Sequence, residues 1–167
     1  MKTISYATWT SPLGSMLFAA SEDGLIGAWF EGQRHFGGRD AAWQIDAAHP
    51  VLRDARRQLE AYFDRSLRRF ELALDPAGTA FQRTVWRAIA AVPYGEVLTY
   101  GELARAAGAA GSARAAGAAT GRNPLSIIVP CHRIVGAGGA LTGYAGGLER
   151  KRALLDLENT LQARIAA

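Results

Sequence analysis

The chain contains one cysteine in 167 residues, Cys131, and His132 follows it directly. A cysteine attacks as its thiolate, and a neighbouring base makes that thiolate easier to form at neutral pH. Because a lone cysteine forms no internal disulfide, Cys131 is either a small buried hydrophobic residue or a nucleophile. Neighbouring side chains of a strand point to opposite faces, so this pair meets, directly or through a water, only if the chain turns after Pro130.

Glu158 is the third group that this chemistry would use. It lies on a predicted terminal helix, four residues after Leu154 and three before Leu161, within the apolar stripe of that helix. A carboxylate that faces a core must be paired, because its desolvation is costly. Either Glu158 orients His132 in a Cys–His–Glu relay, or it forms a salt bridge with an arginine at the helix edge.

The composition is that of a globular protein rather than a membrane or disulfide-rich secreted one. Apolar residues make up 49% and charged residues 20%. The first ten residues lack the apolar core of a signal peptide, and we expect a cytoplasmic, reduced protein with no membrane segment. The net charge of +4 is uneven. Residues 1–75 carry nine basic and ten acidic side chains, whereas residues 76–167 carry ten and five. The second half therefore suits a polyanionic partner.

The first half predicts an antiparallel meander followed by a helix. Alternating apolar runs separated by turn residues predict strands over residues 3–9, 16–20 and 25–30. A helix with one apolar stripe begins at Pro50, and residues 70–74 form a last strand. Residues 75–78 are the predicted linker, where the charge balance also changes. We therefore expect two domains, residues 1–75 and 76–167.

The second half predicts mainly helices. After a first helix that ends near Val92, Thr99 and Glu102 have the spacing of a capping box, so a helix should run from Thr99 to Ala107. Ser112 should cap a further helix that ends at Gly121. Two helices joined by a short glycine-containing turn have the outline of a helix-turn-helix, although a plain helical hairpin gives the same outline. A short strand over 126–129, a glycine-rich segment over 136–147 and a terminal helix over 148–162 complete the prediction.

The second helix of this pair carries Arg114 among alanines and a glycine. Reading base edges in the major groove needs several long polar side chains, and this helix has one. Its small residues permit close approach to a nucleic-acid backbone without sequence preference, and one projecting arginine can enter a base stack. The alternative is a helix of small residues packed inside the core.

With these motifs in place, the chain resembles the O6-alkylguanine-DNA alkyltransferases. The resemblance rests on Pro130-Cys131-His132-Arg133, on Asn123-Pro124 before it, and on Gly143-Tyr144-Ala145-Gly146-Gly147-Leu148 after it. It extends over residues 79–160 and includes Phe81-Gln82, Val85-Trp86 and Val92-Pro93-Tyr94-Gly95. It implies an α+β protein. A ribonuclease-H-like α/β domain would come first, and a mostly helical, winged helix-turn-helix domain second.

The resemblance also assigns roles. Cys131 matches the alkyl acceptor, His132 the water-linked base and Glu158 the carboxylate behind it. Asn123 matches the residue that braces the turn before the active site, and Tyr100 the tyrosine that helps rotate the base and hydrogen-bonds the purine. Arg114 matches the finger that fills the gap left by the extruded nucleotide. The remaining expected DNA contacts are Ala113, Ala115, Gly117 and Arg122. The remaining expected pocket residues are Pro130, Tyr144, Ala145 and Gly146.

The implied activity is a single transfer of an alkyl group from O6-alkylguanine, or O4-alkylthymine, in double-stranded DNA to Cys131. No cofactor is expected, and one cysteine cannot form the structural zinc site of some family members. We expect a monomer that binds DNA largely without sequence preference. Two alternatives remain: a protein that binds alkylated bases without reacting, and a cysteine hydrolase. The first replaces the cysteine in known relatives, and the second leaves Arg114 unexplained.

Overall fold

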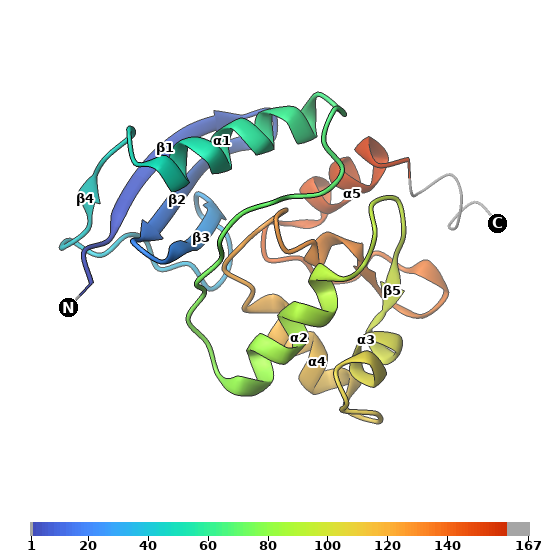
Figure 1. Cartoon of the computed structure of the whole chain (residues 1–167). Coiled ribbons are helices and arrows are strands. Elements are labelled where there is room, and N and C mark those ends of the chain that lie inside the picture. Colours follow the sequence, from blue (N-terminus) through green and yellow to red (C-terminus); the bar gives the residue numbers. More distant parts are fainter. Residues whose placement is uncertain (1, 160–167) are drawn as a thin grey trace. The chain divides into compact units, whose positions relative to one another are not determined.

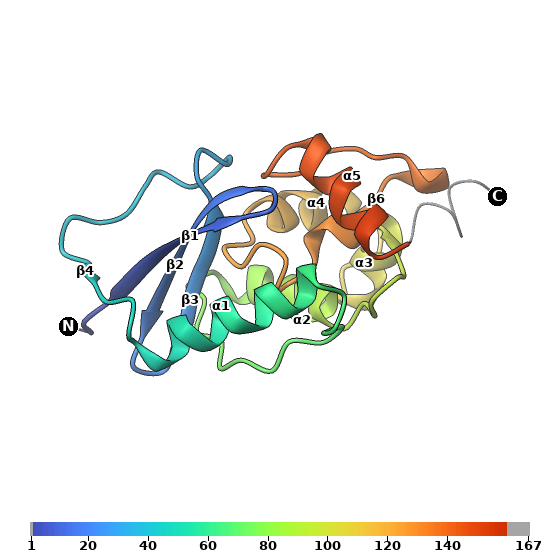
Figure 2. The same ribbon diagram turned by 90° about the horizontal axis from the view of Figure 1, so that it is seen from above.

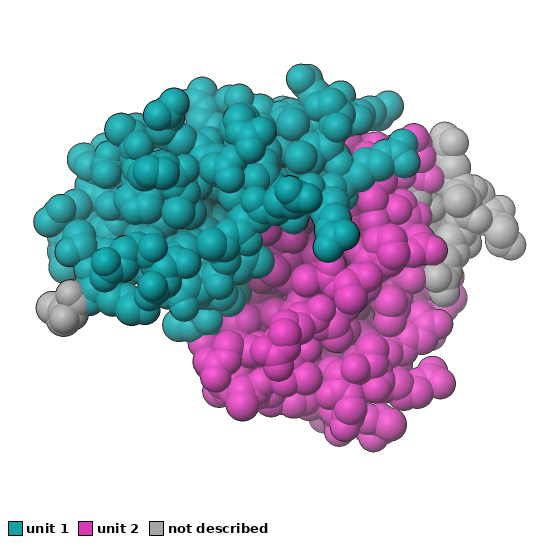
Figure 3. All heavy atoms as spheres, in the orientation of Figure 1, with its two compact units in different colours: residues 1–77, 124–126 teal, residues 78–123, 127–167 magenta. Residues whose placement is uncertain are grey.

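The computed structural model describes residues 2–159, which form two compact units (Figure 3). The first unit contains residues 1–77 together with 124–126, and the second contains residues 78–123 and 127–167. The first unit is a mixed sheet with one helix and the second is mostly helical, so the predicted α+β class is confirmed. The short segment 124–126 belongs to the first unit although it lies far along the chain from the rest of that unit.

The first unit is built on a four-stranded sheet in the order β3-β2-β1-β4 (Figure 1). Strands β1 (Ser5–Ser11), β2 (Gly14–Ser21) and β3 (Gly24–Phe30) form the predicted antiparallel meander, and β4 (Gln44–Ile45) pairs with β1 in parallel. The apolar stripe of helix α1 (Pro50–Phe63) packs on the sheet. The core of this unit is formed by Phe18, Phe30, Leu52, Leu59 and Tyr62, all of which are buried.

The predicted strand over residues 70–74 is wrong in extent, because only a single bridge forms there, between Leu74 and Leu25. The backbone of this segment passes very close to Gly24. A Cβ at Gly24 would lie 2.7 Å from the carbonyl oxygen of Ala73, and the φ of Gly24 is +158°. Only glycine allows this approach, which holds the return segment against the end of β3.

Up to residue 159, the second unit contains four α-helices: α2 (Ala80–Ala90), α3 (Tyr100–Ala106), α4 (Ala113–Gly121) and α5 (Leu148–Leu157). The capping box of Thr99 and Glu102 forms as predicted. Ser112 precedes α4 as expected but makes no capping hydrogen bond through its side chain. Helix α4 packs against α2, where the indole nitrogen of Trp86 donates to the carbonyl of Ala119 at 2.9 Å.

A two-stranded parallel ladder joins the active-site segment to the start of α3. Strand β5 (Leu98–Thr99) pairs with β6 (Ile134–Val135), which follows the motif around Cys131 and is labelled in Figure 2. The predicted terminal helix ends at Leu157. The part of that prediction beyond residue 159 lies outside the described residues.

The predicted strand over residues 126–129 is wrong, because these residues form an irregular turn. Ile127 is fully buried with a φ of +72°, a conformation that β-branched residues rarely adopt. The residues just before it belong to the first unit. The carbonyl of Pro124 accepts from the N–H of Ala28 at 2.8 Å, the N–H of Ser126 donates to Ala28 at 2.9 Å, and the Ser126 hydroxyl donates to Gln33 at 3.0 Å. The β-branched run thus favours a strand by composition, but these contacts and the turn at Ile127 prevent one.

Candidate active site

Cys131 begins a single turn of 3₁₀ helix that spans Cys131–Arg133. The turn after Pro130 ends the extended conformation that would separate the side chains of Cys131 and His132. Cys131 is only 6% exposed, and His132 is fully buried. Cys131 and His132 therefore lie inside the protein, with a small part of Cys131 reaching the surface.

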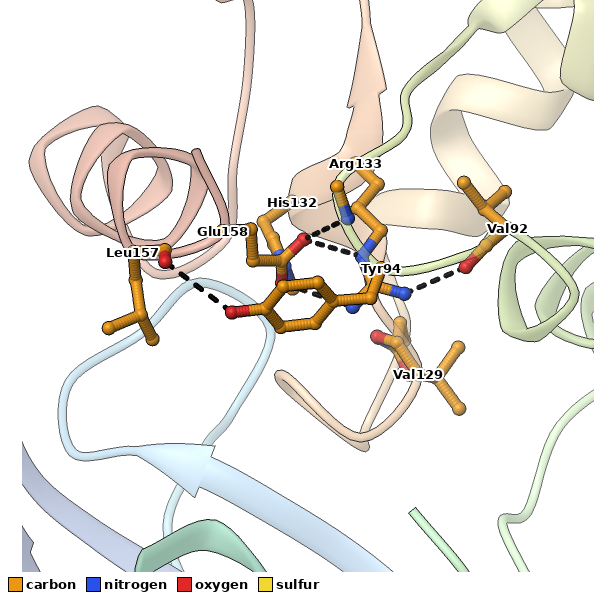
Figure 4. A network of polar contacts seen from close by, with 9 residues as sticks. Val92, Tyr94, Val129, His132, Arg133, Leu157 and Glu158 are labelled. Carbon is orange, nitrogen blue, oxygen red and sulfur yellow. Dashed lines mark hydrogen bonds and ion pairs between the residues drawn. The ribbon is translucent and has the colours of Figure 1, made fainter. Parts of the chain in front are cut away.

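Glu158 connects the end of α5 to this turn (Figure 4). It follows the last residue of the helix rather than lying within its stripe, and its N–H donates to the carbonyl of Leu154 at 3.1 Å. One carboxylate oxygen lies 2.7 Å from Nε2 of His132. The N–H of Gly95 donates to the other oxygen at 3.3 Å. The buried carboxylate thus has the partner that the relay requires.

Arg133 is bound to the same carboxylate, so both interpretations of Glu158 from the sequence apply at once. Nε and Nη2 of Arg133 lie 2.8 and 3.0 Å from the two Glu158 oxygens, and Nη1 donates to the carbonyl of Val92 at 2.7 Å. Burial alone would raise the pKa of Glu158, but the hydrogen bonds and charges of His132 and Arg133 outweigh it and hold that pKa well below its usual range. Glu158 is therefore ionised at neutral pH.

The contact with Glu158 fixes the tautomer of His132. Burial lowers the pKa of His132 more than Glu158 raises it, so the resting imidazole is neutral. Its proton lies on Nε2, facing the carboxylate, and Nδ1 is then an acceptor. Nδ1 is buried and has no hydrogen-bond partner among the described residues. Because buried acceptors are normally hydrogen-bonded, we expect Nδ1 to accept from a water molecule or from the thiol of Cys131.

Burial raises the pKa of the Cys131 thiol, while a hydrogen bond from the Asn123 side chain and the charge of Lys151 lower it. Asn123 also donates from Nδ2 to the carbonyl of Val129 at 2.9 Å. This bond ties Asn123 to the turn that precedes Cys131. The thiol needs a base to ionise near neutral pH, since burial is the largest influence on its pKa.

Lys151 is a site residue that the sequence reasoning missed. It is fully buried on α5, and its ammonium donates to the carbonyls of Ile134, Thr142 and Gly143 at 2.5, 3.1 and 3.0 Å. Burial lowers its pKa to about 8, and Cys131 acts in the opposite direction. Lys151 therefore holds the glycine-rich segment next to the active-site turn and places a positive charge near the sulfur. The spacing from Leu154 and Leu155 puts it on the buried face, which was the available signal.

Tyr100 is the first residue of α3 and lies against both the glycine-rich segment and α4. Its hydroxyl donates to the carbonyl of Thr142 at 3.1 Å, and a Cβ at Gly117 would lie 3.6 Å from its ring. Tyr144 and Ala145 are half-buried, whereas Gly146 and Pro130 are buried. The Tyr144 hydroxyl is buried with no hydrogen-bond partner among the residues described. The structure thus gathers Tyr100 and the segment 142–146 around the turn that carries Cys131.

Helix α4 exposes the residues expected to meet DNA. Ala113, Arg114 and Ala115 are exposed on its first turn, and Arg122 is exposed directly after its end. Ala116, Ala119 and Thr120 form its buried face. Arg114 forms no ion pair with any residue of 2–159 and extends from a surface of methyl groups. The helix is therefore not a wholly buried core helix.

Neither a metal site nor a membrane helix is evident in the part of the chain that the structure describes. No three histidine, cysteine, aspartate or glutamate side chains within residues 2–159 are arranged to hold a metal ion. No helix within those residues is long and apolar enough to cross a membrane.

The first unit is a sheet with a helix, and the second is mainly helical and contains the buried arrangement of Cys131, His132 and Glu158. Two family models match the chain. The ribonuclease-like domain of 6-O-methylguanine DNA methyltransferase matches residues 4–76, and the DNA binding domain of the same protein matches residues 80–160. The chain belongs to the 6-O-methylguanine DNA methyltransferase family.

Individual relatives agree with the family models over nearly the whole chain. A methylated-DNA--protein-cysteine methyltransferase of Methanosarcina acetivorans is 47% identical over 156 residues, which cover 93% of this chain and 98% of that protein. The crystal structure of Mycobacterium tuberculosis OGT in complex with DNA has a TM-score of 0.86 and 45% identity, and the match covers 93% of each chain. The resemblance stated from the motifs is thereby confirmed.

Proposed function

We propose that this chain repairs DNA by transferring the alkyl group of O6-alkylguanine, and of O4-alkylthymine, to the sulfur of Cys131. The class of reaction follows from the family, whose curated members are methylated-DNA--protein-cysteine methyltransferases. Cys131 is the one cysteine of the sequence and therefore the one candidate acceptor. The observation that carries the proposal is the 2.7 Å contact between His132 and Glu158 directly beside this thiol.

The geometry supports proton transfer from Cys131 to Nδ1 of His132, directly or through one water. Glu158 is ionised, so it stabilises the imidazolium that forms. The thiolate then attacks the alkyl carbon; the S–C bond forms as the C–O6 bond breaks, and the electron pair of that bond stays with the guanine. The released guanine anion takes a proton on a ring nitrogen from solvent water, which balances the proton that Cys131 gave to His132, and Tyr100 supplies a hydrogen bond. The product is a thioether, so one protein molecule repairs one lesion and no cofactor takes part.

The limited exposure of Cys131 supports rotation of the damaged nucleotide out of the helix. A sulfur that is covered by its own chain cannot reach O6 of a base that is stacked in a duplex. Base extrusion costs a few kcal/mol, and less for a poorly paired lesion. In this proposal α3 and α4 act as a helix-turn-helix, and Arg114 fills the gap in the base stack. Arg122 contacts a phosphate, and Ala113, Ala115 and Gly117 let the helix approach the DNA backbone.

The extruded base would enter beside Pro130, Tyr100 and the segment around Tyr144. The small side chains at Ala145 and Gly146 leave room for alkyl groups larger than methyl. Because α4 carries one long polar side chain on its exposed face, binding should depend little on DNA sequence. Each chain supplies the complete set of relay groups, which supports action as a monomer, and the free thiol suits a reducing compartment such as the cytoplasm.

Intact-protein mass spectrometry after incubation with O6-methylguanine DNA tests the proposal. We expect a gain of one methylene unit per protein, located on Cys131. The variant Cys131→Ala should show no mass gain while still binding the DNA. A protein that binds lesions without reacting would bind the DNA with no mass change in the wild type, and a hydrolase would release product repeatedly while its mass stayed constant.

A further inference from the structure

The outer edge of β1 is only partly paired. Strand β2 pairs with β1 over its whole length, but β4 covers only Ser5 and Tyr6, where the carbonyls of Ile4 and Tyr6 accept from Gln44 and Asp46. Backbone groups alternate in direction along a strand, so Thr8 and Thr10 direct their N–H and C=O groups along the same outer edge. Within residues 2–159 these groups have no hydrogen-bond partner. An open edge of this kind can accept a further strand.

A groove within the first unit runs beside this edge and is lined by residues of β1 and α1. Its volume is about 260 Å³. Its floor is apolar and is formed by Trp9, Phe18 and Leu52, while its rim consists of side chains of α1. Sites that enclose a whole small ligand usually measure roughly 300–1,000 Å³. The groove therefore suits a few side chains of a longer molecule better than a complete ligand.

The rim of the groove is positively charged. Arg53, Arg56 and Arg57 line it together with Glu60. Arg56 is paired with Glu60, and Arg57 is paired with Asp54, within α1 itself. Arg53 is exposed and forms no ion pair in the described part of the chain, so it is available to a carboxylate. A strand added to the edge would place every second side chain beside this rim.

We propose that the β1 edge and its arginine-rimmed groove bind an extended acidic segment of a partner protein as an added strand. Its acidic side chains meet the α1 rim on one face. The alternate, apolar side chains lie on the opposite face, which Tyr6 shares with Ile45, a residue that is 72% exposed. A nucleic acid offers phosphates to the arginines but no backbone amides in register with Thr8 and Thr10, so the open edge favours a peptide.

An NMR titration with an eight-residue peptide that alternates glutamate and valine, blocked at both ends, tests this surface. We expect shifts at Thr8, Thr10 and Arg53, and at least tenfold slower hydrogen exchange at the amides of Thr8 and Thr10. The same peptide with lysine in place of glutamate, or with N-methyl groups along one edge, should leave these amides unprotected. Protection by the lysine peptide would contradict the charge argument, and protection by the methylated peptide would contradict strand addition.

Protein variants separate the contribution of the charged rim from that of backbone pairing along β1. Arg53→Glu should weaken binding of the acidic peptide about fivefold, which is the upper range for one exposed ion pair. Arg152→Glu makes the same charge change on an exposed residue of α5 and should have no effect. Thr10→Pro removes the outward N–H while β2 remains paired through Trp9 and Ser11, and it should abolish protection at Thr8.

Stronger binding of a single-stranded octathymidylate than of the acidic peptide would overturn the proposal in favour of nucleic acid. Equal peptide binding by wild type, Arg53→Glu and Thr10→Pro would overturn it altogether. Alkyl transfer to Cys131 should be unchanged in Arg53→Glu, so failure of this proposal is distinguishable from failure of the proposed repair reaction.

Discussion

The buried pair of Arg133 and Glu158 gives the sharpest prediction about stability. Arg133 is 6% exposed and Glu158 is 3% exposed, and two hydrogen bonds of 2.8 and 3.0 Å join them. Removing one partner of such a pair leaves a buried charge uncompensated and costs about 3–5 kcal/mol. We therefore expect Glu158→Gln and Arg133→Met each to lower the free energy of unfolding by about that amount at pH 7.

The double variant isolates the interaction. With both charges gone no buried charge is left unpaired, so the double variant should lose about 1–3 kcal/mol less than the sum of the two single variants. Urea denaturation at pH 7 measures all four proteins, and Glu149→Gln on the exposed first turn of α5 is the control. Losses that add within about 0.5 kcal/mol would refute the inference that this pair is coupled in the folded protein.

The same pair predicts how the free energy of unfolding falls at low pH. The pKa of Glu158 is depressed in the folded protein, and an unfolded glutamate has a pKa of about 4.3. A depressed carboxyl pKa contributes stability above the unfolded value, and this contribution is lost as the pH falls toward the folded value. Wild-type stability should therefore drop as the pH falls below about 5, and Glu158→Gln should show a shallower drop. An identical slope in both proteins would contradict the role of the carboxylate.

Three further predictions concern the reaction and its supports. Arg114→Ala should slow repair of duplex DNA about tenfold, because the arginine side chain replaces roughly 1–2 kcal/mol of lost base stacking. The reaction with free O6-benzylguanine should stay unchanged. Equal losses on both substrates would count against the role of Arg114 in the base stack. Lys151→Met should remove the donor of three hydrogen bonds to backbone carbonyls. We expect it to lower the free energy of unfolding by about 2–4 kcal/mol and to slow the reaction with free O6-benzylguanine. A variant as fast and as stable as wild type would exclude a supporting role for Lys151. The rate of benzyl transfer should rise between pH 6 and pH 9, since burial raises the pKa of Cys131 and the thiolate increases with pH, while the lowered pKa of His132 keeps the base neutral. A flat profile would show that proton removal does not limit the rate.

The chemistry of the site was more predictable from the sequence than the local backbone was. Cys131 and His132 are adjacent in the chain, and a carboxylate at Glu158 had to be paired, so residue types alone predicted that Glu158 binds either His132 or an arginine. The form of the connection was not predictable. The turn at Ile127 runs against the strand preference of a β-branched run, and its cause is a set of contacts with residues nearly one hundred positions earlier.

The burial of Lys151 is a second feature of the site that the sequence did not predict. Most lysines on a helix rich in charged residues extend into solvent, and the segment from Leu148 to Leu157 contains several such residues. The burial of Lys151 depends on three carbonyls that the chain brings together only in the folded state. Arg133 belongs to the motif around Cys131, and its bond to Glu158 depends likewise on where α5 ends. Pairings between distant segments of this kind are not encoded in local spacing.

The three residues that the first unit takes from the second half of the chain have a practical consequence. Leu125 is fully buried and bridges Ala28, and the irregular turn that leads to Cys131 begins right after them. Heat that melts β3 would release this segment and, with it, the start of the turn that precedes Cys131. The temperature of inactivation should then follow the melting temperature of the sheet in the first unit, although that sheet contains none of Cys131, His132 and Glu158. A fragment that begins at the interdomain linker would contain the motif around Cys131 but would lack the strand that Leu125 contacts.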